Sequence, residues 1–257
     1  MQREYTNKNV VVTGSFSGIG RAVATAYASE GANVFLVDAN PRIEEASEAI
    51  AAQTQAKVTA IHCDISDANH VERAFSDIER IDVLIANAGI EAATPIDGPM
   101  NVYLEKFKRI SEVNITGTYL TIAFARQRMA AGSSIVITSS IWGKTAVPDF
   151  AAYNASKHAN LGLMRTLAKE LGPHGIRVNA VCPGWVKTGP AMESLRILAN
   201  EKNCSEEALL KELSEEQCFG EVQSPEDVAF AYLMLTSKYS INVTGQAINA
   251  DRGALLT

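Results

Sequence analysis

The 257-residue chain carries 29 acidic and 23 basic side chains, so its formal net charge is −6, and its lysines and arginines form no cluster. Binding to nucleic acid depends on concentrated positive charge, so this composition argues against a nucleic-acid-binding protein. Apolar residues make up 47% of the chain and charged residues 20%. These values are typical of a folded globular protein and exclude a disordered or collagen-like one.

Targeting and metal-binding signals are missing from the sequence. The residues before the first apolar run contain no hydrophobic segment of a secretory signal, and no apolar stretch reaches the ~20 residues that span a bilayer. The cysteines have no spacing typical of a metal site; they are Cys63, Cys182, Cys204 and Cys218. We therefore expect a cytoplasmic protein with reduced thiols, no bound metal and no membrane partner.

Along the chain, short β-branched runs alternate with stretches of helical periodicity. The runs are apolar without strict alternation, as in a parallel sheet covered on both faces, and they occupy residues 9–13, 33–38, 57–62, 82–87, 134–139, 176–181 and 246–250. This order predicts an α/β fold: a doubly wound, Rossmann-type parallel sheet of seven strands in a single domain over residues 1–257. A (β/α)₈ barrel is the alternative at this length, but a single glycine-rich first turn favours the open sheet.

Two helix starts are marked by capping residues. Asn40 followed by Pro41 predicts an N-cap with proline at the first helical position, and the sequence SPED at residues 224–227 predicts another such start. An unusually long helical pattern covers residues 102–130. Residues 189–222 are rich in glutamate, carry no strand pattern and follow the sixth strand. Either a mobile helical flap that covers a substrate cleft or a plain surface insertion fits them.

The first strand leads directly into a glycine-rich turn, TGSFSGIG, which opens a helical pattern at residues 21–31. Gly14, Gly18 and Gly20 let the backbone turn sharply and approach a ligand, and the free N–H groups at the start of the helix attract a pyrophosphate. Such a glycine pattern is weak alone and becomes strong between a strand and a helix. We therefore expect this turn to bind a dinucleotide.

Asp38 lies at the C-terminal edge of the second strand, about 20 residues beyond the glycines. A carboxylate there accepts hydrogen bonds from both hydroxyls of an adenosine ribose and repels the phosphate that distinguishes NADP. The neighbouring Ser15 and Ala39 carry no positive charge that would hold that phosphate, so the sequence predicts NAD as the cofactor. Arg42 lies close enough to keep NADP as an alternative.

Further motifs follow the later strands. They are Asp64 after the third, NAG at residues 87–89 after the fourth, Asn114 in VNITG, Ser140 in ITSS, YNASK at residues 153–157, and Pro183 with Gly184 after the sixth. In this order, and together with the glycine-rich turn, they resemble the motifs of the classical short-chain dehydrogenase/reductase family over nearly the whole chain. The resemblance implies reversible hydride transfer between NAD(H) and a secondary alcohol or ketone.

By this resemblance, four side chains carry the chemistry. Tyr153 is the general acid and base, Lys157 lowers its pKa and holds the nicotinamide ribose, and Ser140 orients the substrate oxygen. Asn114 positions a water that relays protons from Lys157. The physical chemistry agrees, because bringing a phenol of pKa ~10 near 7 requires roughly 4 kcal/mol. A lysine one helical turn away and the positive nicotinamide can supply that stabilisation.

The resemblance also implies the cofactor pocket, in which Tyr153 and Lys157 take part. Its other residues are Gly14, Ser17, Gly18, Ile19, Gly20, Asp38, Asp64, Ile65, Asn87, Ala88, Gly89, Pro183, Gly184, Val186 and Thr188. Asp64 is expected near the adenine, with an Asx turn as its alternative role. One departure is Arg252, because the family usually carries glycine there; its backbone either avoids a positive φ or is strained.

The substrate is expected against side chains that follow the strands and begin the flap. They are Glu91, Ser140, Ile141, Trp142, Val147, Phe150, Tyr153, Trp185 and Met192. The aromatic rings suggest a cyclic or apolar body, and Glu91 suggests a hydroxyl or an amine, so a cyclic or polyol-like alcohol is the hypothesis. Ordinary packing is the alternative role of each side chain.

Three other functions stay open as alternatives. An NADPH-dependent 3-oxoacyl-carrier-protein reductase has the same catalytic motifs, but Asp38 and the lack of a basic docking patch count against it. A non-catalytic regulator that senses NAD(H) would not need the set of Tyr153, Lys157 and Ser140. A sugar epimerase or dehydratase usually has a longer C-terminal substrate domain. For assembly, the resemblance implies a homotetramer, or a homodimer, built on the helices at residues 102–130 and 150–172.

Overall fold

The computed structural model describes residues 3–256, in which seven strands form one parallel sheet in the order β3-β2-β1-β4-β5-β6-β7. The strands are β1 (Asn9–Thr13), β2 (Asn33–Asp38), β3 (Val58–His62), β4 (Val83–Ala86), β5 (Ser134–Thr138), β6 (Arg177–Pro183) and β7 (Ala247–Ala250). The predicted doubly wound sheet is confirmed, with strand ends shifted by one or two residues. The winding reverses between β1 and β4, where open α/β sheets form a ligand crevice at the carboxyl ends of the strands.

Burial on both faces explains why the strand runs are apolar without alternation. Val10, Val11 and Val12 of β1 are all fully buried. Val11 belongs to the core cluster on one face of the sheet, whereas Val10 and Val12 belong to the cluster on the other. β-branched side chains suit these positions because they pack well on a pleated surface that is covered on both sides.

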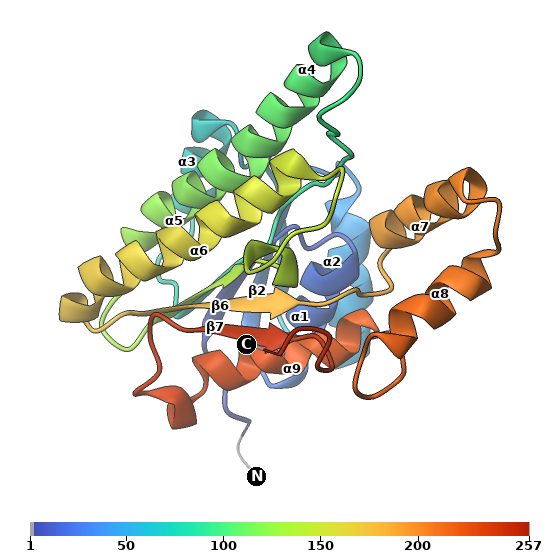
Figure 1. Cartoon of the computed structure of the whole chain (residues 1–257). Coiled ribbons are helices and arrows are strands. Elements are labelled where there is room, and N and C mark those ends of the chain that lie inside the picture. Colours follow the sequence, from blue (N-terminus) through green and yellow to red (C-terminus); the bar gives the residue numbers. More distant parts are fainter. Residues whose placement is uncertain (1–2, 257) are drawn as a thin grey trace.

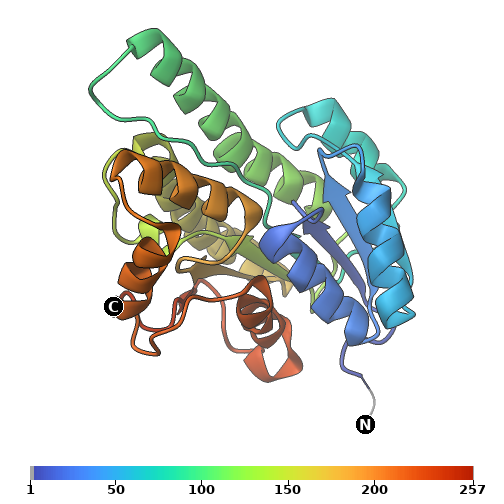
Figure 2. The same ribbon diagram turned by 90° about the vertical axis from the view of Figure 1, so that its right-hand side faces the viewer.

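Helices cover the two faces of the sheet (Figure 1). One face carries α1 (Gly18–Ser29), α2 (Ile43–Thr54) and α9 (Pro225–Thr236); the other carries α3 (Ala68–Ser76), α4 (Met100–Ser111), α5 (Thr118–Arg126) and α6 (Ala151–Leu171). The view in Figure 2 shows α4 projecting beyond the sheet. Short 3₁₀ segments occupy Ile141–Gly143, Gly172–His174 and Lys238–Ser240. Among residues 3–256, no helix has the length and apolarity that crossing a bilayer requires.

Of the two predicted helix starts, one is confirmed and one is wrong. Helix α9 begins with a capping box, in which Ser224 Oγ accepts the Asp227 amide (3.2 Å) and Asp227 Oδ2 accepts the Ser224 amide (2.8 Å). Helix α2 begins two residues later than predicted, because Asn40 Oδ1 accepts the Arg42 amide (2.9 Å) in an Asx turn. That turn uses the side chain that would have capped the helix.

The long helical pattern at residues 102–130 is divided by a π-helical segment, Glu112–Gly117, between α4 and α5. Asn114 lies in this segment and is fully buried. Its carbonyl oxygen accepts a hydrogen bond from Thr118 Oγ1 at 2.8 Å. Single π turns of this kind are rare and often lie at functional sites.

Helices α7 (Gly189–Glu201) and α8 (Glu206–Glu215) form a hairpin outside the layers, on the right in Figure 1. Leu195, Ala199 and Leu209 hold the two helices together in a small apolar cluster, with Trp185 packed against it. This hairpin and the loop after it occupy the range 189–222, which we call the flap below; its role as a cover of the substrate stays a prediction.

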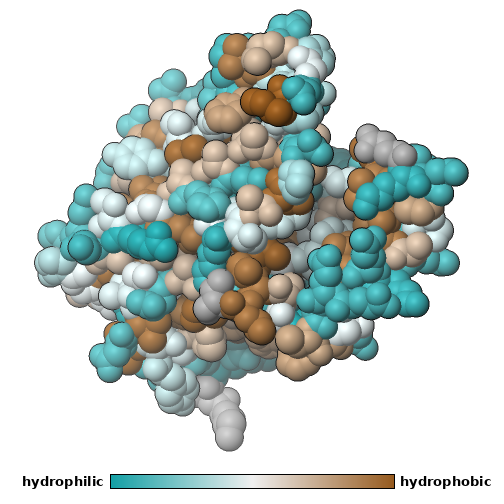
Figure 3. Space-filling view, in the orientation of Figure 1, coloured by the Kyte–Doolittle hydropathy of each residue, from teal (hydrophilic) through white to brown (hydrophobic). Residues whose placement is uncertain are grey.

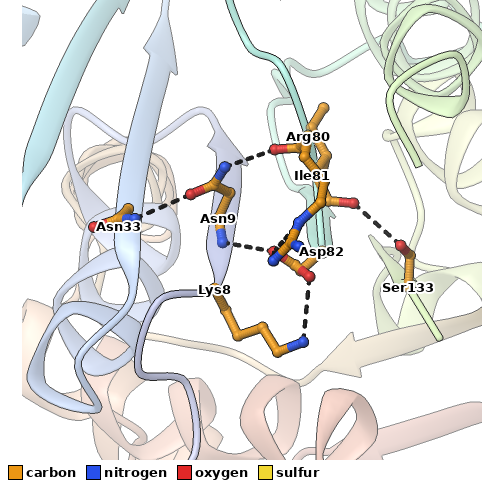
Figure 4. A network of polar contacts seen from close by, with 7 residues as sticks. All are labelled: Lys8, Asn9, Asn33, Arg80, Ile81, Asp82 and Ser133. Carbon is orange, nitrogen blue, oxygen red and sulfur yellow. Dashed lines mark hydrogen bonds and ion pairs between the residues drawn. The ribbon is translucent and has the colours of Figure 1, made fainter. Parts of the chain in front are cut away.

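The opposite, amino-terminal edge of the sheet is fixed by a polar network (Figure 4). Asp82 accepts hydrogen bonds from the Asn9 amide (2.9 Å), Lys8 Nζ (3.3 Å) and Arg80 (2.9 Å). The network ties the start of β1 to the start of β4, whose register pairs Val10 with Val83. The network therefore fixes the alignment of β1 and β4, and with it the relative position of their carboxyl ends.

Candidate active site

A cavity of about 570 Å³ opens at the carboxyl ends of the strands. It brings together most of the expected site residues: Gly14, Ser17, Gly18, Ile19, Gly20, Asp38, Asn87, Ala88, Gly89, Glu91, Ser140, Ile141, Trp142, Phe150, Tyr153, Lys157, Pro183, Gly184, Trp185, Val186 and Thr188. The expected Asp64, Ile65, Asn114, Val147 and Met192 lie outside its lining. Flap residues line one side, so the hairpin borders the cavity.

The glycines of the first turn are required mainly by close contacts within the protein. Gly14 has a φ of +65°. A Cβ on Gly20 would lie 2.0 Å from the Gly14 carbonyl oxygen, and a Cβ on Gly14 would lie 2.6 Å from Ala88 Cα. The turn, the start of α1 and the end of β4 therefore meet without room for side chains.

Helix α1 begins at the cavity. Its N-cap residue, Ser17, makes no side-chain capping hydrogen bond, and Ser17, Gly18, Ile19 and Gly20 all line the cavity. The first turn therefore presents backbone N–H groups and the positive end of the helix dipole to the space in front of it. This cradle fits the pyrophosphate of a dinucleotide.

Asp38 lines the cavity with its carboxylate fixed by two backbone donors. Oδ2 accepts the Phe16 amide at 2.9 Å, and Oδ1 accepts the Asn40 amide at 2.8 Å. Each oxygen keeps a second lone pair for another donor. Arg42 is close by, with its guanidinium carbon 5.2 Å from the centre of the Phe16 ring.

Asn87 joins three strands at the cavity floor. Its Nδ2 donates to the carbonyl oxygens of Thr13 (3.0 Å) and Gly14 (3.1 Å), and its Oδ1 accepts from Thr138 Oγ1 (3.2 Å). The side chain therefore braces the ends of β1, β4 and β5, and the backbone of residues 87–89 lines the cavity.

Tyr153 and Lys157 lie on one face of α6 and border the cavity, where Lys157 is buried and Tyr153 is partly exposed. Lys157 Nζ donates to the Thr138 carbonyl at 3.0 Å and lies 5.3 Å from the centre of the Tyr153 ring, in cation–π geometry. Burial lowers the pKa of Lys157 to about 8, against the opposing effect of the Glu91 carboxylate. Burial also raises the pKa of Tyr153, as does Glu91, while the Ser140 hydroxyl lowers it.

Ser140 follows β5 and caps the 3₁₀ turn at Ile141–Gly143. Its Oγ accepts the Trp142 amide at 3.2 Å. The same hydroxyl lowers the pKa of Tyr153. The turn therefore fixes Ser140 beside the tyrosine, where a substrate oxygen can meet both groups.

Asn114 supports the site from behind the cavity. Its Oδ1 accepts the Ile90 amide (2.8 Å), and its Nδ2 donates to the Ile90 carbonyl (2.9 Å) and to Ser156 Oγ (3.0 Å). The side chain thus ties the π-helical segment to the loop after β4 and to α6. Its expected role in holding a proton-relay water stays a prediction.

Asp64 and Ile65 have partners within the protein. Asp64 accepts Ser66 Oγ (2.7 Å) and the Ser66 amide (3.0 Å), which is the Asx turn kept as its alternative role, and Arg109 NH2 (2.9 Å). Ile65 is buried, and a Cβ on Gly117 would lie 2.8 Å from its Cδ1. The adenine contact of Asp64 stays a prediction.

The substrate end of the cavity has an apolar wall and a carboxyl group. The Trp142 ring lies 5.7 Å from the Phe150 ring and 5.9 Å from the Tyr153 ring, centre to centre. Glu91 Oε1 accepts Ser194 Oγ at 3.4 Å. Burial raises the pKa of Glu91, while Ser194 and Lys157 lower it.

Two of the residues expected near the substrate, Val147 and Met192, lie outside the cavity lining, and the lining contains others that were not expected. Met192 packs against the apolar cluster of the flap instead of lining the cavity, because its helix turns that side toward Leu195 and Leu209. The cavity is also lined by residues that no motif marked: Thr138, Ser194, Leu213, Glu216, Gln217 and Ala254. Most come from the flap and the C-terminal loop, whose sequence carries no spacing signal for a site.

Arg252 has a φ of +54°, in the left-handed region that favours glycine. Its guanidinium bridges Glu221 Oε2 and Asp227 Oδ2, both at 3.1 Å. These ion pairs compensate for the backbone cost and tie the C-terminal loop to the base of the flap.

Within residues 3–256, His, Cys, Asp and Glu side chains nowhere gather in groups of three or more that could hold a metal ion. The donor set of the cavity therefore consists of hydroxyl, ammonium, amide and carboxyl groups, placed around the start of a helix.

Comparison with known proteins agrees with this geometry. The family model described as enoyl-(acyl carrier protein) reductase matches residues 14–254. A short-chain dehydrogenase/reductase of Armillaria gallica is 36% identical over 252 residues, which are 95% of this chain and 94% of that protein. The 2,5-dichloro-2,5-cyclohexadiene-1,4-diol dehydrogenase of Sphingobium indicum is 34% identical over 258 residues, which are 97% and 98% of the two chains.

A solved structure extends the likeness to three dimensions. L-sorbose reductase of Gluconobacter frateurii, complexed with NADPH and L-sorbose, matches with a TM-score of 0.89 and 26% identity over 100% of both chains. The fold and the near full-length sequence matches agree with the motifs that meet in the cavity. The chain belongs to the short-chain dehydrogenase/reductase family of oxidoreductases.

Proposed function

We propose that the protein is an NAD-dependent oxidoreductase that transfers a hydride reversibly between NAD(H) and a secondary alcohol or ketone. The observation that carries this proposal is that Tyr153, Ser140 and Lys157 border one cavity with the uncapped start of α1. A dinucleotide whose pyrophosphate lies at that helix start would reach across the strand ends to the tyrosine.

The side chains divide the chemistry among themselves. The bound nicotinamide would accept the hydride of the carbinol carbon. Tyr153 would take the hydroxyl proton of the alcohol, Ser140 would donate a hydrogen bond to its oxygen, and Lys157 would stabilise the phenolate by its charge. In ketone reduction, Tyr153 would return the proton to the carbonyl oxygen.

Asp38 supports NAD rather than NADP. Its two oxygens are oriented by the Phe16 and Asn40 amides, and the residue lines the cavity at the end of β2, where an adenosine ribose would lie. Hydroxyl groups can donate to both oxygens, whereas a ribose phosphate would meet the same negative charge at short range. Arg42 is exposed and lies 3.7 Å from Glu45, so part of its charge is already offset.

A cyclic or polyol-like alcohol is the proposed substrate class. The apolar wall of Trp142 and Phe150 suits a ring, and Glu91 suits a hydroxyl group. The names of two similar proteins, a cyclohexadiene-diol dehydrogenase and an L-sorbose reductase, describe substrates of this kind. Residues 189–222 would cover the substrate as a flap.

Reduction of a 3-oxoacyl carrier protein is the second candidate, favoured by the likeness to a solved 3-oxoacyl-[acyl-carrier protein] reductase of Brucella melitensis, which is 30% identical with a TM-score of 0.84. Asp38 disfavours an NADPH-dependent reductase of this kind, and the net charge of −6 disfavours the docking of an acidic carrier protein. A non-catalytic NAD(H) sensor is disfavoured by the complete set of Tyr153, Ser140 and Lys157.

We also propose a homotetramer in the cytoplasm. Exposed apolar side chains lie on α4 and α5: Met100, Val102, Leu104, Phe107 and Tyr119. Figure 3 shows brown residues over α4 at the top of the view. Burial of these side chains against a second copy would remove them from water.

The test is turnover of alcohols with NAD⁺ or NADP⁺, and of ketones and 3-oxoacyl thioesters with NADH or NADPH, for the wild type and Tyr153→Phe. We expect activity with cyclic or polyol-like alcohols and NAD, and a loss in kcat/KM of at least a thousandfold in the variant. If Tyr153→Phe stays within about tenfold, ~1.4 kcal/mol, the tyrosine is not the acid. Activity confined to acyl thioesters would contradict the alcohol assignment.

A further inference from the structure

The side of the cavity formed by the flap holds a buried polar atom without a partner. Gln217, just after α8, is 6% exposed and lines the same cavity as Ser140 and Tyr153. Among the residues that the structure describes, none offers a hydrogen bond to its Oε1. A buried amide oxygen without a donor costs free energy, so such a group calls for a ligand.

Gln217 is held in place by the C-terminal loop. The amide of the next residue, Cys218, donates to the Arg252 carbonyl at 2.9 Å, and the Arg252 guanidinium binds Glu221 and Asp227. The Gln217 carbonyl accepts the Gly220 amide at 3.2 Å. The amide side chain is therefore presented by a braced loop instead of a free one.

A second acceptor comes from the floor of the cavity. Glu91 follows β4, and its one recorded donor, Ser194 Oγ, is 3.4 Å away, at the weak end of hydrogen-bond distances. A substrate hydroxyl could replace or join that contact at little cost. Glu91 and Gln217 thus both offer oxygen acceptors, from different elements, to the same cavity.

We propose that Glu91 and Gln217 form a second polar subsite, which accepts hydrogen bonds from a hydroxyl of the substrate other than the one that reacts. On this assignment, which rests on the proposed alcohol oxidation, the enzyme prefers diols and polyols to mono-alcohols. A site built to bind a hydroxyl discriminates strongly against an analogue without it, because its buried acceptors are then left unpaired. The apolar wall formed by Trp142 would discriminate much less between a diol and a mono-alcohol, because it forms no hydrogen bond with either.

The test compares cis-cyclohexane-1,2-diol with cyclohexanol, which differ by one hydroxyl. We expect the wild type to favour the diol at least tenfold in kcat/KM. Gln217→Met and Glu91→Met, which each remove an acceptor oxygen, should each reduce that preference at least fivefold, mainly through KM. Gln217→Met should keep cyclohexanol turnover within threefold. Glu91→Met removes a charge that acts on the pKa of Tyr153 and Lys157, so for this variant only the ratio of the two substrates is compared. Glu215→Gln, on an exposed position of α8, is the matched control and should leave the preference unchanged.

Binding gives a second readout. Calorimetric titration of the NADH-bound enzyme with the diol should show weaker binding to Gln217→Met than to the wild type, with equal binding of cyclohexanol. Thermal unfolding verifies that each variant is folded. If Gln217→Met does not fold, Gln217→Glu takes its place. This variant keeps an acceptor oxygen at residue 217 and should therefore retain the preference for the diol.

Equal losses for both substrates would assign Gln217 to the support of the flap and overturn the subsite. An unchanged preference in both variants would also overturn it. If the wild type oxidises cyclohexanol but not the diol, the subsite fails while the proposed function stands. If the wild type and Tyr153→Phe are equally inactive on both, the proposed function fails, and the subsite with it.

Discussion

Replacement of Asp38 by asparagine should shift the enzyme from NADH toward NADPH. The change keeps the shape of the side chain and removes its charge. In Coulomb's law, a carboxylate and a doubly charged phosphate about 5 Å apart repel by ~2 kcal/mol at the dielectric of water. Hydrogen bonds from the ribose to a charged acceptor exceed those to a neutral one by about 1 kcal/mol. The sum of ~3 kcal/mol corresponds to a change of about a hundredfold in cofactor preference.

The measurement is the ratio of kcat/KM for NADH to that for NADPH, with one ketone at saturation. The substitution also forfeits one of the two backbone contacts of Asp38, with the Phe16 or the Asn40 amide, so we expect a loss of about 1 kcal/mol in unfolding free energy. Glu48→Gln, at an exposed position of α2, is the control for an equal change of net charge. A wild type that prefers NADPH, or a ratio that changes less than threefold in Asp38→Asn, would refute the reasoning.

Two further predictions concern stability. Burial lowers the pKa of Lys157 from 10.5 to about 8 in the folded protein. Between these two pH values the unfolded chain binds more protons than the folded protein. The contribution of Lys157 to stability therefore increases as pH rises from about 8 to 10.5. The measurement is the thermal unfolding midpoint of the wild type minus that of Lys157→Met at several pH values. This difference should increase over the window, and a difference that stays constant with pH would contradict the effect of burial. Gly20→Ala places a methyl group 2.0 Å from the Gly14 carbonyl and should destabilise the fold by more than ~3 kcal/mol in denaturant titration. The matched control is Gly162→Ala in α6, where a Cβ meets nothing within 4 Å. It should stabilise the fold by roughly 0.5–1 kcal/mol. If both substitutions changed the unfolding free energy equally, the contact between Gly14 and Gly20 would not be tight.

The strands and the grouping of the candidate catalytic side chains could be predicted from the sequence because their signals are local. Val10, Val11 and Val12 are consecutive apolar residues that suit a strand covered on both sides, whichever helices cover it. Tyr153 and Lys157 stand one turn apart on a helix, so their proximity follows from the helix alone. Parallel strands bring their carboxyl ends to one edge, which is why Ser140 and the first glycine turn meet the same cavity.

Only the tertiary structure decided the contacts between segments that are distant in the chain. Asp64 pairs with Arg109, Met192 turns to the flap cluster, and Gln217 borders the cavity. Each depends on how a loop or a short helix packs on a remote element, which neither periodicity nor spacing specifies. The sequence by itself therefore determined the sheet, the helix-borne pair and the place where they meet, whereas the shape of the substrate side was decided by long-range packing of the flap and the C-terminal loop.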